Sequence, residues 1–211
     1  MFIPRHPVVE NQFCSYAAEA GGSAGIGGVV AYAGSVVYLD AAAVNEEPIV
    51  KKMTFAAGTT GSLPAFGFLM QKVKTGYHQV HPAGFVMPGD QGSSDVIAQP
   101  AYNASGVITG TKAAPVGVAH FGIWDTVHYT CTSVASIPTA KMAPGESLYA
   151  AVDQAKVTNN ITVAANDADL TTGENCVAAV VARVMKGASL AKCVANVANT
   201  TLYPIRIKLL I

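Results

Sequence analysis

The stretch GVAHFGIWDTVHYT, residues 117–130, decides the fold expected of this chain. It contains the single tryptophan, Trp124, and two of the five histidines, His120 and His128. Aromatic and β-branched side chains fit the pleated, half-buried surface of a sheet better than they fit a helix. The stretch therefore predicts a long central strand, from residue 116 to residue 132, bent at Gly122.

The same stretch contains the strongest candidate for chemistry. His120, Asp125 and His128 have the side chains of a catalytic or metal-binding cluster. In a regular strand the two histidines share one face and Asp125 points to the other, although a bulge at Gly122 would change this. We therefore favour a structural interpretation, in which the histidines bond to the backbone or lie at an interface. Trp124 then anchors a core or a subunit contact.

Two further motifs fail their structural requirements. GGSAG at residues 21–25 fits the G-x-S-x-G nucleophile pattern with Ser23 as nucleophile, but that motif requires a buried strand before it and a helix after it. More glycines follow instead, which predicts a flexible linker. His78 and His81 are spaced as H-x-x-H, but a third ligand is missing and Pro82 favours a loop. The sequence predicts no catalytic residue, no cofactor site and no metal site.

Composition favours a subunit over a solitary domain. Charged residues make up 12% of the 211 residues and the net charge is zero, against about a quarter charged in typical domains. Phosphate binding needs clustered Lys and Arg, so nucleic acid is not expected as the main partner. Mean hydropathy is +0.35, and near-zero net charge promotes association. We expect a chain that buries much of its outside against neighbours; an Ala/Gly/Val-rich core is the alternative.

No membrane span and no signal peptide are expected. The uncharged run at residues 20–39 is rich in glycine and poor in large aliphatic side chains, and the first seven residues contain two prolines and no apolar core. The four cysteines are scattered without a C-x-x-C pair, which is typical of free, buried thiols.

The first 28 residues are predicted to form an extended N-terminal arm. Two prolines and the glycine-rich run at 21–28 disfavour regular structure there. The apolar side chains of the arm need a surface to cover them, and we expect that surface on a neighbouring subunit. These interaction residues are Phe2, Ile3, Val8, Val9 and Phe13.

Residues 29–211 are predicted to form an all-β domain, a β-barrel or sandwich of short strands with long loops. A faint internal echo, AGSVVYL at 33–39 against PGESLYA at 144–150, suggests two related β units, about 29–110 and 111–211. The last three strands are expected at 176–185, 192–197 and 203–209. The best helix candidate is residues 170–179.

Four segments carry a resemblance to a known family. In order, AGSVVYLD (33–40), FGFLMQKV (66–73), GVAHFGI (117–123) and GESLYA (145–150) are similar to head decoration, or cement, proteins of tailed bacteriophages. The resemblance loosely spans residues 33–150 and concerns the style of strands and turns, so it transfers no catalytic residues.

The resemblance implies a structural virion protein, made in the host cytoplasm and bound to the outer capsid surface. Its partners would be the major capsid protein and other copies of itself, as a homotrimer or alternatively a dimer, with Trp124, His120 and His128 as candidate interface residues. The competing interpretations are another virion component, such as a minor capsid, tail or fibre-base protein, and a small hydrolase that uses Ser23 or His120.

Overall fold

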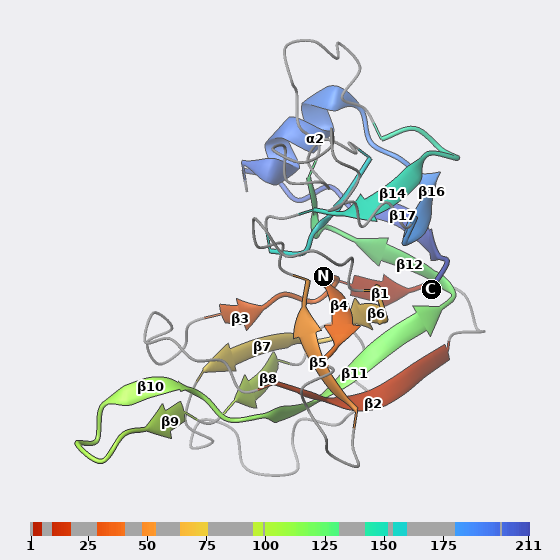
Figure 1. Ribbon diagram of the computed structural model, residues 1–211. Coiled ribbons are helices and arrows are strands. Elements are labelled where there is room, and N and C mark those ends of the chain that lie inside the picture. Colours follow the sequence, from red (N-terminus) through yellow and green to blue (C-terminus); the bar gives the residue numbers. More distant parts are fainter. Residues whose placement is uncertain are drawn as a thin grey trace, which may run out of the picture.

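The computed structural model describes residues 2–5, 10–17, 29–40, 48–53, 64–75, 95–98, 100–130, 142–151, 154–159, 180–198 and 200–211. Strands dominate these residues, beside one helix, α2 (Leu190–Val197), so the predicted all-β fold is confirmed (Figure 1). The strands are β1 (Phe2–Pro4), β2 (Glu10–Tyr16), β3 (Val29–Ala31), β4 (Val36–Leu39), β5 (Ile49–Lys52), β6 (Gly67–Leu69), β7 (Lys72–Thr75), β8 (Asp95–Ala98), β9 (Pro100–Tyr102), β10 (Ile108–Thr111), β11 (Ala114–Phe121), β12 (Ile123–Thr126), β13 (Tyr129–Thr130), β14 (Ser147–Ala150), β15 (Val157–Thr158), β16 (Ala182–Lys186) and β17 (Ile205–Leu209).

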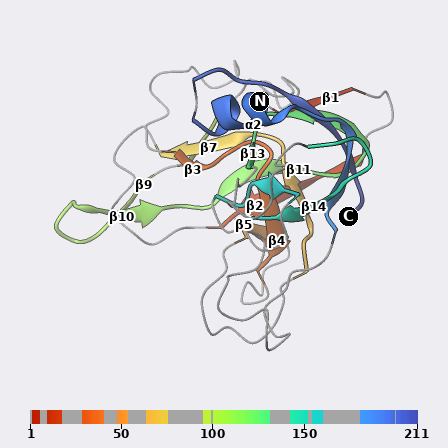
Figure 2. The same cartoon turned by 90° about the horizontal axis from the view of Figure 1, so that it is seen from above.

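The strands form a barrel, two smaller sheets and one large sheet. The closed barrel runs β11-β2-β5-β4-β6, and the seven-stranded sheet has the order β1-β12-β17-β16-β14-β15-β13. A three-stranded sheet, β3-β7-β8, lies on the barrel side, and β9 and β10 pair as a two-stranded sheet. Figures 1 and 2 both show the β9–β10 hairpin extending away from the barrel.

The predicted central strand joins the barrel to the large sheet. Instead of one strand from 116 to 132, the chain forms β11, β12 and β13. Gly122 separates the first two with φ of +111°, a conformation that side chains with a Cβ rarely adopt, so the expected bend lies at this residue. Before it the chain pairs within the barrel, and after it within the large sheet. The change of sheet therefore occurs at Gly122.

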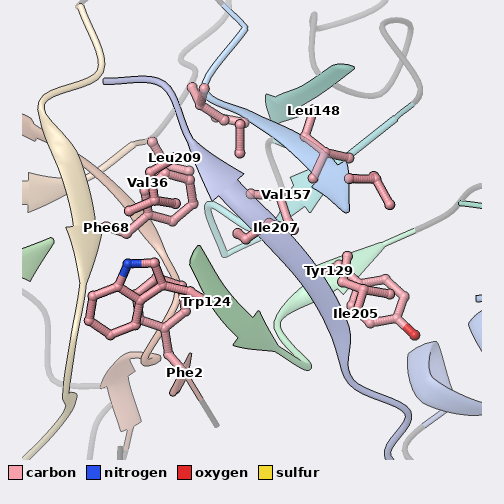
Figure 3. Close-up of a cluster of buried hydrophobic side chains, with 14 of the residues drawn as sticks. Phe2, Val36, Phe68, Trp124, Tyr129, Leu148, Val157, Ile205, Ile207 and Leu209 are labelled. Carbon is pink, nitrogen blue, oxygen red and sulfur yellow. The ribbon is translucent and has the colours of Figure 1, made fainter. Parts of the chain in front are cut away.

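Two apolar clusters fill the interior, and the pleat of the strands separates them. Successive side chains of a strand point to opposite faces. Val36 and Phe68 accordingly belong to the cluster between barrel and large sheet, whereas their neighbours Val37 and Leu69 belong to the other. Figure 3 shows the first cluster, where Trp124 lies close to residues of the barrel strands.

The arm prediction is wrong for the parts of residues 1–28 that the structure describes. β1 pairs antiparallel with β12 in the large sheet, and β2 pairs with β11 and β5 in the barrel. Phe2 is completely buried between Phe68 and Trp124. The prolines and polar residues of this segment argued against strands. Pro4 is tolerated because it lies at the end of an edge strand, where its missing N–H leaves no ladder hydrogen bond unmade.

The strand predicted at 192–197 is also wrong, because these residues belong to α2. Cys193 and Asn196 are buried and three residues apart, whereas Leu190 and Val194 are exposed and four apart, which is a helical period. The sequence did not reveal this helical period, because the exposed side of α2 carries apolar Leu190 and Val194 while polar Asn196 is buried. The helix candidate at 170–179 lies outside the described residues.

Candidate functional site

The strongest charged cluster joins the N-terminal segment to the last strand. Asp125 on β12 is almost completely buried and accepts hydrogen bonds from Arg5 and Arg206. The Nε of Arg5 lies 2.6 Å from one carboxylate oxygen, and the Nε of Arg206 lies 2.8 Å from the other. β12 lies between β1 and β17 in the sheet, so the strand order brings the three side chains together.

The two arginines decide the protonation of Asp125. Burial raises the pKa of its carboxyl, but the hydrogen bonds and charges of Arg206 and then Arg5 outweigh burial, and the pKa is lowered below its ordinary value of 3.8. The same contact raises the pKa of Arg206. Asp125 is therefore a carboxylate at neutral pH. An ionised, doubly paired carboxylate stabilises structure and is a weak proton acceptor.

His128 belongs to a different cluster, with Ser35 and the turn between β14 and β15. Its Nε2 lies 3.0 Å from the Ser35 hydroxyl and 3.0 Å from the carbonyl oxygen of Gln154. The Ser35 hydroxyl also donates to that carbonyl, at 3.0 Å. A serine beside a histidine has the composition of a nucleophile and its base. Ser35 is completely buried, however, and its hydrogen atom is used by the carbonyl.

The turn that this cluster holds is conformationally unusual. Gln154 and Ala155 have φ of +55° and +52°, values that residues other than glycine adopt at a cost. The carbonyl of Gln154 is held by Ser35 and His128, and the carbonyl of Ala155 accepts from the Val36 amide at 2.9 Å. These contacts fix the turn against the barrel strand β4. The cluster therefore joins the two β layers.

His120 lies apart from both clusters, on β11. Its Nδ1–H donates to the carbonyl of Phe66 at 2.7 Å, and the Phe66 ring meets the imidazole edge-on. Its Nε2 is buried and has no hydrogen-bond partner. The sequence placed His120, Asp125 and His128 in one candidate cluster; the structure gives each a separate set of partners. The predicted backbone bonds of the histidines are present.

Trp124 and His128, two of the candidate interface residues, are buried within the chain itself. Trp124 is completely buried, its ring stacks on that of Phe2, and its indole N–H donates to the Phe121 carbonyl at 3.1 Å. His128 is 7% exposed and stacks on Tyr32. Both residues point inward because the strand changes sheets at Gly122. Of the two interpretations of Trp124, a core or a subunit contact, the core is the one the structure shows.

The predicted arm residues have different environments. Phe2 is buried, Ile3 is partly buried, and Phe13 on β2 is 64% exposed. Val8 and Val9 lie outside the described residues, as do Ser23, His78 and His81. Phe13 is therefore the one member of the set that the structure shows with a largely uncovered ring.

Among the residues that the structure describes, no group of three or more His, Cys, Asp or Glu side chains is arranged to hold a metal ion. Cys14 and Cys193 are both buried, and neither forms a disulfide. Within the same residues, no helix is long and apolar enough to span a membrane.

Sequence reasoning missed Arg5, Arg206, Ser35 and Gln154. The alternation IRIKL along β17 contained a usable signal, because it places Arg206 on the polar face of a strand that pairs with β12. Nothing in the sequence marks Ser35 or Gln154, whose contacts depend on how two distant turns meet.

The geometry thus defines an all-β chain whose polar clusters link strands to one another. No protein-family model matches the chain, and a search of curated proteins finds no match.

Proposed function

We propose that this chain is a structural protein of a tailed-bacteriophage virion, a decoration protein that binds the outer capsid surface and stabilises contacts between major capsid subunits. The proposal begins from the resemblance of four segments between residues 33 and 150 to head decoration proteins. In the structure these segments contain β4, β6, β14 and the second part of β11, which belong to the barrel and to the large sheet.

One structural observation carries the proposal furthest, the amount of large apolar surface left uncovered. On α2, Leu190 and Val194 are exposed on one side of the helix, and Leu202 beyond its end is 59% exposed. Phe13 and Phe121 are exposed on neighbouring barrel strands. Leu190 and Val194 lie one helical turn apart and form a small apolar patch, and exposed apolar patches mark sites of association. A chain with zero net charge has little net repulsion to oppose association.

Capsid decoration fits this surface because the apolar side chains lie at separate places. Phe13 lies on the barrel, whereas Leu190 and Val194 lie on α2, beside the large sheet (Figure 1). A protein that bridges several capsid subunits makes several modest contacts at once, and their combination gives high avidity. The major capsid protein and further copies of this chain, as a homotrimer or a dimer, are the proposed partners, and the capsid surface is the proposed location.

The test uses empty, expanded shells of the major capsid protein from the virus that encodes this chain. We expect the purified chain to co-sediment with the shells to saturation and to raise their melting temperature in calorimetry. Failure to bind shells, with binding to purified tails instead, would favour a tail or fibre-base component. Failure to bind either particle would contradict a virion role.

The hydrolase alternative has one observation in its favour, the contact between Ser35 and His128. Hydrolysis of p-nitrophenyl esters by the purified chain, lost in Ser35→Ala, would favour it. We expect no such Ser35-dependent activity, because the hydroxyl is completely buried.

A further inference from the structure

One face of the large sheet concentrates positive charge. Along β17, buried Ile and Leu residues alternate with Arg206 and Lys208, which therefore lie on the outward face. The register pairs Arg183 of β16 with Lys208 and Lys186 with Arg206, so these residues share that face. Arg5 reaches it through Asp125. We call these five residues the basic face: Arg5, Arg183, Lys186, Arg206 and Lys208.

The basic face holds five of the thirteen Lys and Arg residues of a chain whose net charge is zero. One acid, Asp125, lies among them, and it is shared by Arg5 and Arg206. No carboxylate of the described residues forms an ion pair with Arg183, Lys186 or Lys208. All three of these side chains are exposed.

The register makes this arrangement unfavourable for the isolated chain. Arg183 lies directly opposite Lys208, and Lys186 lies directly opposite Arg206. Like charges in directly opposed positions destabilise an antiparallel pair. Asp125 offsets Arg206 in the second pair, but no acid of the described residues pairs with either member of the first, so we look for a partner of opposite charge.

A β-bulge lies at the centre of this face. The register between β16 and β17 shifts between Val184 and Lys186, and Met185 is the additional residue. Both Met185 and Lys186 are exposed, so the bulge presents an apolar and a cationic side chain together. Bulges occur preferentially beside functional sites, where they redirect side chains.

The chemistry of the face favours a protein partner. Met185 of β16 is exposed, and Ile3 of β1 and Ile123 of β12 are partly exposed on the same face, where Ile3 pairs with Asp125 and Ile123 with Lys208. Protein interfaces combine an apolar centre with a polar rim, whereas nucleic-acid interfaces are more polar and much more positively charged. Arg5 and Arg206 already bind the carboxylate of Asp125 through their Nε atoms. An acidic protein surface would present the same chemical group.

A second copy of the chain does not satisfy this face through a symmetric contact. In a two-fold interface the same surface meets itself. Arg183, Lys186 and Lys208 would then approach their own copies, and like charges across an interface oppose association.

We infer that the basic face binds a carboxylate-rich surface of another protein. The identification of that protein as the major capsid protein rests on the proposed function. The double variant Arg183→Gln with Lys208→Gln removes two exposed charges that do not contact Asp125. The matched control, Lys112→Gln with Lys74→Gln, removes two charges on the barrel side, away from both the basic face and α2.

The first experiment measures binding to empty shells. We expect the Arg183/Lys208 variant to bind about tenfold more weakly than the unaltered chain, and the control within about twofold. Shell binding by the Arg183/Lys208 variant equal to that of the control overturns the inference and leaves the proposed function intact. If the unaltered chain does not bind shells, the proposed function fails and the second experiment decides the inference.

The second experiment needs no capsid. Fluorescence anisotropy measures binding of labelled poly-L-glutamate and of a DNA duplex with the same number of charges. We expect poly-L-glutamate to bind, to be released as NaCl rises from about 50 mM to about 300 mM, and to bind the Arg183/Lys208 variant about tenfold more weakly than the control. The inference is overturned if poly-L-glutamate does not bind, or if it binds the Arg183/Lys208 variant and the control equally. It is also overturned if DNA binds more tightly than poly-L-glutamate and the Arg183/Lys208 variant weakens that DNA binding.

Discussion

Phe2 stacks on Trp124, with ring centroids 4.5 Å apart and ring planes 7° from parallel. On its other side Phe2 stacks on Phe68, with centroids 5.7 Å apart. The second residue of the chain thus lies between a strand of the large sheet and a strand of the barrel. The N-terminal segment contributes directly to the core that joins these two layers.

Phe2→Ala should strongly destabilise the chain. It removes a completely buried ring from between two aromatic neighbours, and such truncations cost about 3–5 kcal/mol. The matched control is Phe13→Ala, because Phe13 is 64% exposed and should change the free energy of unfolding by less than about 1 kcal/mol. Urea denaturation followed by tryptophan fluorescence measures both. Equal effects would mean that the N-terminal strand is not docked in solution.

The same two variants also test the proposed function, and there Phe13→Ala should have the larger direct effect. Phe13→Ala should weaken shell binding with little change in stability, because its ring is uncovered in the chain itself. Since Phe2 is buried, any effect of its replacement on shell binding should follow the loss of folded protein.

The Asp125 cluster should make stability depend on pH at the acidic end. Its pKa in the folded chain lies below the ordinary value of 3.8, so its contribution is complete well above that value and is lost as pH falls through 3.8 and then through the folded pKa. Asp125→Asn should cost about 1–2 kcal/mol at neutral pH, because both arginines are partly exposed and the pair is partly screened.

The measurement is urea denaturation of Asp125→Asn and of the unaltered chain between pH 7 and about pH 3. The difference between them should shrink as pH falls, because protonation of Asp125 removes the same charge that the substitution removes. A difference that stays constant down to the lowest pH would show that the carboxylate is not preferentially ionised in the folded chain.

The sequence predicted the strands best where alternation was strict. IRIKL at residues 205–209 has a buried-exposed pattern that any inspection detects, and β17 forms there with that pattern. β4 forms at VVYL, residues 36–39, where β-branched and aromatic side chains favour a strand and the flanking glycine, serine and aspartate favour turns.

The sequence failed where a contact between distant segments decides the outcome. Phe2 and Trp124 are far apart in the chain, and no local pattern near Phe2 shows that its segment pairs with β12. The period of α2 was concealed because apolar Leu190 and Val194 are exposed, whereas polar Asn196 is buried. Strand parity correctly separated Asp125 from the histidines. It did not separate His120 from His128, because the chain changes sheets at Gly122 and β12 ends at Thr126.

Cys14 should be unreactive in the native chain. Its thiol is buried in the apolar cluster that contains Val37 and Leu69, and burial raises the pKa of Cys14 to about 11. The thiolate, which is the reactive form, is therefore rare at neutral pH. A short pulse of iodoacetamide at neutral pH, followed by peptide mass spectrometry, should leave Cys14 unmodified, whereas the same pulse in denaturant should label it. Rapid labelling of the native chain would show that β2 leaves the barrel readily.

Gly34→Ala should cost more than Gly145→Ala, although the two backbones are nearly alike. Both glycines have positive φ, +92° and +88°, so replacement by alanine imposes a similar backbone strain of about 1–2 kcal/mol. A Cβ at Gly145 meets open space, whereas a Cβ at Gly34 lies 2.9 Å from the Thr126 hydroxyl and 3.2 Å from the Cβ of His128. Gly34→Ala should therefore lose a further 1–3 kcal/mol or so from overpacking.

This comparison isolates the packing between barrel and large sheet, because Gly34 belongs to the barrel side and Thr126 to β12. Calorimetric melting of the two variants measures it, with the unaltered chain as reference. Equal losses of melting temperature in Gly34→Ala and Gly145→Ala would mean that β12 does not pack against this turn. A larger loss in Gly34→Ala would show that the two layers meet as closely in solution as Thr126 and Gly34 do here.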